Sequence, residues 1–266
     1  MTMVGGGSSI GQYYPAPSPL HALDPRAKLL AAAALVVGLF LVDSMAGMLL
    51  VLAAVGVAAA ISRVPPGAFG RLLRPVLFIV ALTALFQVLF SREGPLLVGW
   101  GPLEVHEGGV RTGVFLALRI ALLVTSAALV TATTPPVALA DAMEDLLSPL
   151  RRLRFPAHEM AMMMTIALRF IPTLDEEAQK IMRAQAARGA DFSEGGVAGR
   201  LRAVLPVLVP LTVGAFRRAD ELAEAMESRG YRGGEGRTRY RELRFGWRDV
   251  ATLGAAVLLT GGAAAL

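Results

Sequence analysis

Two arginines occupy the same local setting at widely separated places in the chain. Each follows a small residue and precedes a glycine, in Ala187-Arg188-Gly189 and again in Ser228-Arg229-Gly230. A guanidinium group presents its N–H donors in a fixed fork, so it binds carboxylates or backbone carbonyls with defined geometry. The chemistry that these residue types offer is therefore recognition of another molecule.

A purely local explanation fits the same pattern. Glycine directly after a helix adopts the left-handed conformation that ends it, and an arginine in the last turn complements the negative end of the helix dipole. This explains where each helix stops. It does not explain why two helices should carry an exposed charge at corresponding ends, so both explanations stay open.

Residues for catalysis or metal binding are otherwise scarce. No Gly-x-x-x-x-Gly-Lys-Ser/Thr loop occurs, so this chain is not expected to bind ATP. There are no cysteines, and His21, His106 and His158 are not at metal-ligand spacing. The acidic run Asp175-Glu176-Glu177 is typical of a solvated helix turn. We expect no catalytic residue, metal site or cofactor in this chain.

The composition indicates that a bilayer is the solvent for much of the chain. Hydrophobic residues make up 55% of the 266 positions, whereas soluble domains have about 45–50%. Several of the apolar stretches are short for a span and would need tilt or local thinning. The five predicted spans are Ala27–Val42, Met45–Ile61, Val76–Phe90, Gly113–Thr134 and Val250–Leu266. Arg119, near the start of the fourth, is expected to reach the interface.

Basic residues predict the orientation. Arg26 and Lys28 stand at the start of the first span, Arg63, Arg71 and Arg74 lie between the second and third, and 18 of the 26 Lys and Arg fall within 135–248. The positive-inside rule places these segments in the cytoplasm. The N-terminus is therefore expected inside and the C-terminus outside. No signal peptide is expected, so the first span directs insertion.

The segment between the fourth and fifth spans is unusually long. Hydrophobic periodicity predicts a short amphipathic helix over Val137–Leu150 and two long helices, Ala157–Arg188 and Gly199–Arg229. Each long helix is apolar in its first half and polar in its second, and each ends in Arg-Gly, which makes an approximate internal repeat. Kinks are expected at Pro172, Pro206 and Pro210.

The predicted fold is an all-α integral membrane protein. It has about five transmembrane helices, with a long cytoplasmic pair of helices and one short amphipathic helix between the fourth and fifth spans. The segments are an N-terminal cytoplasmic segment (1–26), transmembrane helices one to four (27–134), a cytoplasmic or interfacial region (135–248) and a C-terminal transmembrane helix (249–266).

Three connecting segments have predictions of their own. The basic cluster of Arg151, Arg152 and Arg154 suits anionic headgroups, or else is a solvated loop. Residues 191–196 are predicted as a turn. The glycine-rich, acidic segment Gly94–Gly109 is predicted as an extracytoplasmic loop.

On these residues the chain resembles the transmembrane T component of energy-coupling factor transporters, which import vitamins and trace metals into prokaryotes. The resemblance rests on IGQYYPAPSPLHALDPRAKLL at 10–30, on the amphipathic middle segment and on the two small-Arg-Gly motifs. Within the first of these, Asp24 is suited to cap a helix and Pro25 to its first position.

The resemblance implies a non-catalytic subunit in the cytoplasmic membrane, with two ABC-type ATPases bound at its cytoplasmic side. The ATPases, as one or two gene products, hold ATP and Mg²⁺. Arg188 would seat in a groove of one ATPase and Arg229 in a groove of the other. Closure of the ATPase dimer would then move the two helices.

The resemblance also implies a third partner, a membrane-embedded substrate-binding S component held by the apolar halves of the long helices. The thioethers of Met160, Met162, Met163 and Met164 suit a partner that rotates or is exchanged, and Leu208 is expected to join them. Burial of these residues against neighbouring helices of the same chain is the alternative.

Two other function classes, a secondary transporter and a membrane-embedded enzyme, predict different sequence features. A self-sufficient secondary transporter should show inverted repeats and polar groups at mid-membrane, and a membrane-embedded enzyme should show an acidic or histidine cluster at the inner face. The predicted spans lack the former, and Asp175-Glu176-Glu177 is the nearest approach to the latter. The basic charge balance indicates topology rather than nucleic-acid binding. The substrate is not named by the sequence, because the S component carries that specificity.

Overall fold

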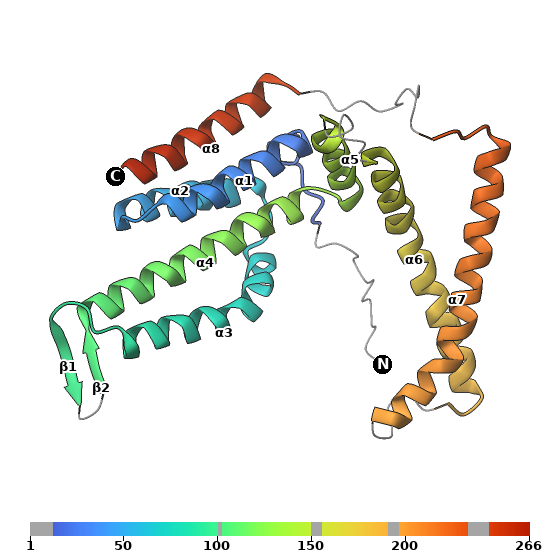
Figure 1. Ribbon diagram of the computed structural model, residues 1–266, viewed down its shortest axis with the longest axis horizontal. Helices are drawn as coiled ribbons and strands as arrows, with labels where there is room; N and C mark the ends of the chain where they lie inside the picture. Colours follow the sequence, from blue (N-terminus) through green and yellow to red (C-terminus); the bar gives the residue numbers. More distant parts are fainter. Residues whose placement is uncertain (1–12, 101–102, 150–155, 191–196, 234–244) are drawn as a thin grey trace. The chain divides into compact units, whose positions relative to one another are not determined.

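The computed structural model describes residues 13–100, 103–149, 156–190, 197–233 and 245–266. The basic cluster at 151–154 and the predicted turn at 191–196 lie outside these residues. Two compact units divide the chain: one is Met1–Ala142 with Glu242–Leu266, and the other is Met143–Arg241. In chain order the elements are α1 (Pro25–Leu41), α2 (Met45–Ser62), α3 (Pro66–Phe90), β1 (Leu96–Trp100), β2 (Leu103–His106), α4 (Glu107–Thr133), α5 (Pro136–Leu147), α6 (Ala157–Ala187), α7 (Val197–Ser228) and α8 (Trp247–Ala265) (Figure 1).

Side-chain caps start the first two helices where the sequence predicts. Asp24 accepts a hydrogen bond from the backbone N–H of Arg26, and Pro25 occupies the first turn of α1. Ser44 caps α2 by accepting from the N–H of Gly47. Each cap satisfies a donor that the first helical turn otherwise leaves unpaired.

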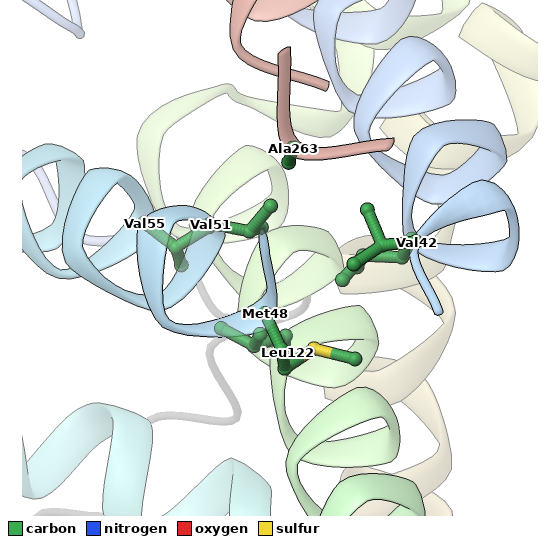
Figure 2. Close-up of a cluster of buried hydrophobic side chains, with 7 residues drawn as sticks. Val42, Met48, Val51, Val55, Leu122 and Ala263 are labelled. Atoms are coloured by element: carbon green, nitrogen blue, oxygen red, sulfur yellow. The ribbon is translucent and has the colours of Figure 1, made fainter. Parts of the chain in front are cut away.

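The core of the first unit lies where the end of α1 meets the start of α2. Leu39 and Val42 pack there with Met48, Val51 and Leu122, all nearly inaccessible (Figure 2). Ala263 brings α8 into the same cluster. The approach of α8 is close enough that a side chain on Gly38 would collide with Thr260.

Among the described helices, three are long and apolar enough to cross a bilayer: α2, the part of α3 from Leu73 to Phe90, and α4. The two remaining predicted spans form as helices, α1 and α8, but α1 has only 17 residues. The two helices pack against each other, α1 also packs against α4, and α8 also packs against α2. Five crossings therefore remain a prediction, which this packing supports.

The segment between α3 and α4 is not the loop predicted from its glycines. It forms an antiparallel hairpin in which Leu96 pairs with His106 and Trp100 with Leu103. The apolar and β-branched residues around Gly99 favour extended backbone over a loop. The protein is nevertheless all-α in its architecture, because α-helices make up almost all of its regular structure.

In the second unit α6 and α7 are continuous helices of 31 and 32 residues, and they run antiparallel and cross one another (Figure 1). The predicted short helix is α5, which ends three residues earlier than expected, at Leu147. Pro172, Pro206 and Pro210 all lie within the long helices without interrupting them. Kinks at these prolines stay a prediction.

Candidate partner-docking site

The end of α6 is a glycine-terminated cap. Gly189 has φ +88°, in the left-handed region that glycine adopts without strain. Its N–H donates to the carbonyl of Ala186 at 3.0 Å, and the N–H of Ala190 donates to that of Gln185 at 3.0 Å. This pair of bonds is the Schellman motif, which satisfies carbonyls left free at the helix end.

The end of α7 repeats the arrangement bond for bond. Gly230 has φ +73°, and its N–H donates to the carbonyl of Glu227 at 2.9 Å. The N–H of Tyr231 reaches back to Met226 at 3.0 Å. The capping role of the two glycines is thus confirmed, and each motif arginine stands in the residue just before the left-handed turn.

Both ends are open to a partner. The six motif residues, Ala187, Arg188, Gly189, Ser228, Arg229 and Gly230, are all exposed. No atom lies within 4 Å of where a Cβ would sit on either glycine. Within the described parts of the chain, neither guanidinium takes part in an ion pair or hydrogen bond. The hydrogen bonds of both Schellman motifs join backbone groups only, so both guanidinium groups are available to bind another molecule.

An ion pair between Glu177 and Arg218 joins α6 to α7 at their crossing. Gly214 belongs to the same contact, since a Cβ there would lie 3.2 Å from the Glu177 carboxylate. Beside the pair is an apolar groove of about 300 Å³. Its lining is Ile166, Phe170 and Leu174 from α6, with Ala215, Ala219, Leu222 and Met226 among those from α7.

The crossing is placed symmetrically with respect to the two arginine ends. Glu177 stands eleven residues before Arg188, and Arg218 stands eleven residues before Arg229. Because the helices are antiparallel and rise 1.5 Å per residue, the two ends point in opposite directions and lie roughly 30 Å apart. The two helix ends of the weak sequence repeat are thus related by an approximate two-fold axis through the ion pair.

Each long helix also exposes apolar side chains before the crossing. Met160, Met163 and Met164 are 45%, 59% and 55% exposed, and Leu208 on α7 is 51% exposed. These four side chains are therefore not buried within their own unit, whereas Met162 is half-buried. Further exposed apolar residues on α7 are Val204, Leu205, Val209, Val213 and Phe216.

Sequence reasoning missed a second contact of this unit. Nδ1 of His158, at the start of α6, lies 2.9 Å from Oε1 of Glu144 near the end of α5. Glu144 is almost fully buried, whereas acids on an amphipathic helix usually lie on its solvent face. The pair joins α5 to α6, and its fourteen-residue separation gave no signal in the sequence.

A buried polar cluster in the first unit was also missed. Lys28 is 7% exposed, and its Nζ donates to the Thr133 carbonyl at 3.0 Å. The carboxylate of Asp249 accepts from the N–H groups of Asp24 and Gly246, both at 2.8 Å. The cluster therefore joins the starts of α1 and α8 to the end of α4.

The Asp24 carboxyl in this cluster is held ionised. Burial raises the pKa of Asp24, but the hydrogen bonds and charge of Arg26 outweigh burial, so the pKa lies below its ordinary value. Arg26 contacts it through both Nε, at 3.1 Å, and Nη2, at 2.9 Å. Arg26 was predicted only as a topology signal, and it also fixes the cap of α1.

These features define an α-helical membrane protein whose two long helices each end in an exposed Arg-Gly turn. The family model for CbiQ, described as cobalt transport protein, matches residues 16–240. The chain belongs to this family of transport proteins.

Relatives support this across almost the full length. The energy-coupling factor transporter transmembrane protein EcfT of Bacillus subtilis is 46% identical over 251 residues, which cover 94% of each chain. The proteins of the same name from Thermosediminibacter oceani and Thermanaerovibrio acidaminovorans are 48% and 49% identical, covering 96% of each chain and 92% and 91% respectively. The predicted resemblance is confirmed, and the chain is the energy-coupling membrane component of a transporter, not a self-sufficient carrier.

Proposed function

We propose that this chain couples two ABC-type ATPases to a membrane-embedded S component in an importer of a vitamin or trace metal. The observation that carries the proposal is the pair of identically capped, exposed arginine ends. A single binding groove would need one such end. Two ends related by an approximate two-fold fit a partner that is itself a two-fold dimer.

The ATPases supply the chemistry in this proposal. They bind ATP and Mg²⁺, while Arg188 seats in one subunit and Arg229 in the other. Each guanidinium would bond carboxylate or carbonyl oxygens of its groove, with the glycine turn allowing close approach of the backbone. The two ends lie on opposite sides of the crossing, so motion of the ATPases on ATP binding would turn the helices about it.

The exposed apolar residues of α6 and α7 are the proposed contact for the S component. In a membrane subunit such side chains face lipid or another protein. Flexible methionines suit a surface that must repack as its partner rotates. Pro172, Pro206 and Pro210 lack a backbone donor, which lowers the cost of bending each helix near its apolar half. We infer that these prolines permit the motion.

The proposed setting is the cytoplasmic membrane of a prokaryote, with the N-terminus and the α5–α7 segment inside. The distribution of Lys and Arg supports this orientation. The segments would be those predicted: a cytoplasmic 1–26, transmembrane helices in 27–134 and 249–266, and the coupling helices within 135–248.

Assembly tests the proposal directly. Co-expression of the full chain with the ATPases and S component from neighbouring genes should give a complex with one copy of this chain and two ATPase subunits. The measurement is native mass spectrometry of the purified complex, with and without the ATPase genes. Transport of substrate by the chain reconstituted alone would contradict the proposal.

A charge on the apolar surface should release the S component only. Met163→Glu and Leu208→Glu each place a carboxylate where an apolar partner would desolvate it, so we expect S component recovery to fall about tenfold or more. Met182→Glu is the matched control, because Met182 is also partly exposed but lies beyond the crossing. ATPase recovery should not change. Unaltered S component in both test variants would place its contact elsewhere.

A further inference from the structure

The first unit contains a groove that the proposed coupling does not use. It has a volume of about 620 Å³ and is walled by α1, α2, α4 and α8. Ligand pockets commonly measure about 300–1,000 Å³. Pro19, Leu20 and Leu23, in the segment before α1, also line it.

The groove lies beside the hydrophobic core that the four helices share. Leu39 and Val42 at the end of α1 fill the core with Met48 and Val51 at the start of α2. Many of the side chains that face the groove are alanines, whose small size leaves space unfilled. The alanines that line it include Ala31, Ala54, Ala58, Ala255 and Ala256.

A cation and an indole ring stand at the mouth of the groove. Trp247 is 76% exposed, and the Arg248 guanidinium lies 5.7 Å from the centre of its ring. The carboxylates nearby are already occupied, since Asp249 accepts two backbone N–H groups and Asp24 binds Arg26. Arg248 forms no ion pair with any residue that the structure describes.

The length of the groove matches one leaflet of a bilayer. Along α8 its lining runs from Trp247 to Leu259, which spans about 18 Å at 1.5 Å per residue. Half of a hydrocarbon core is about 15 Å. Tryptophan and arginine are the side chains that mark the headgroup level of a membrane protein. An apolar groove of this length, with Trp247 and Arg248 at one end, has the shape and charge of a lipid site.

We propose that this groove binds one acyl chain of an anionic phospholipid from the cytoplasmic leaflet, with the lipid phosphate on Arg248. The surrounding bilayer supplies the chain, and filling the groove restores the dispersion contacts that small side chains leave unmade. The charge-assisted bond to phosphate selects an anionic headgroup. The site is independent of the arginine ends on α6 and α7.

Quenching of Trp247 tests the proposal in the full-length chain. A Trp100→Phe background leaves Trp247 as the sole tryptophan, because the chain has two. In nanodiscs, brominated phosphatidylglycerol should reach half-maximal quenching at about fivefold lower mole fraction than brominated phosphatidylcholine. Arg248→Gln should abolish this difference. Arg92→Gln, an exposed arginine at the end of α3, should retain it.

Two adjacent alanines of α2 provide a matched control for the groove itself. Ala54 lines it, whereas Ala53 is exposed and does not. Native mass spectrometry of the detergent-purified chain should find one phosphatidylglycerol retained in wild type and in Ala53→Phe, and none in Ala54→Phe. If Ala54→Phe fails to fold, Ala255→Phe at the exposed rim carries the same expectation.

Other results would overturn the assignment. Equal quenching by the two brominated lipids in the Trp100→Phe background would show that the groove does not select an anionic headgroup. Retention of phosphatidylglycerol by folded Ala54→Phe or Ala255→Phe would place the lipid outside the groove. If neither lipid quenches Trp247 in the assembled transporter, a protein segment fills the groove instead.

Discussion

Reversing both motif arginines, Arg188→Glu together with Arg229→Glu, should abolish ATPase assembly and substrate uptake while the chain still folds and inserts. In the proposed complex each guanidinium is an interface anchor. Loss of such an anchor costs about 2–4 kcal/mol, and reversal of its charge adds repulsion from the groove. Each single variant should therefore lose about thirtyfold or more in ATPase affinity, and the double variant should show no complex.

Folding should be little affected, because the favourable interaction of an exposed charge with a helix end is worth only about 0.3–1 kcal/mol. Both are exposed, and the cap at each helix end is made by backbone groups alone. The controls are Arg183→Glu on α6 and Arg217→Glu on α7, which reverse exposed charges outside the two Arg-Gly motifs. ATPase recovery and uptake in vesicles are the measurements. The controls should assemble as wild type does.

Replacement by lysine distinguishes fork-like recognition from charge alone. Arg188→Lys with Arg229→Lys keeps both positive charges and removes the bidentate geometry, so assembly should be weakened but not lost. Normal uptake by the double glutamate variant would contradict the docking proposal. Failure of the control variants would show instead that the general charge of these helices matters.

Asp249→Ala should destabilise the first unit by about 3 kcal/mol, because it leaves the ammonium group of Lys28 buried with one fewer anion. It also deprives the backbone N–H groups of Asp24 and Gly246 of their acceptor. Thermal unfolding of the detergent-purified chain is the measurement. We expect the Tm to fall by roughly 10 °C.

Two variants separate the causes. Asp249→Asn keeps one carbonyl acceptor and loses the charge, so its Tm should lie between those of wild type and Asp249→Ala. Asp43→Ala is the matched control, because the Asp43 side chain is 92% exposed and its ion pair with Arg119 spans 3.6 Å. Such a pair contributes little. Equal destabilisation by Asp43→Ala and Asp249→Ala would show that burial of the cluster does not matter.

Local rules accounted for most of the helices. The start of α1 at Asp24-Pro25 and the ends of α6 and α7 at Arg-Gly are set by cap chemistry within a few residues, which a sequence displays directly. The hairpin after α3 was missed because the glycines of Gly94–Gly109 gave a loop signal, while cross-strand pairing joins residues several positions apart.

The candidate site was visible in the sequence only in part. The six motif residues were identified because a small residue followed by Arg-Gly occurs twice, and their exposure agrees with the docking role proposed. What the repeat could not show is that Glu177 and Arg218, equally placed before the two ends, meet at the crossing. A pairing between separate helices depends on their direction and register, and neither follows from periodicity.

By itself, then, the sequence determined that this is a helical membrane protein with two arginine-glycine helix ends, since solvent preference and helix capping are local properties of residue types. Only the tertiary structure decided that the ends point apart, that Lys28 and Asp249 share a buried cluster and that an alanine-lined groove opens beside them. These depend on contacts between residues up to 225 positions apart. Such contacts are determined by the packing of segments that are far apart in the sequence, and no local sequence pattern encodes that packing.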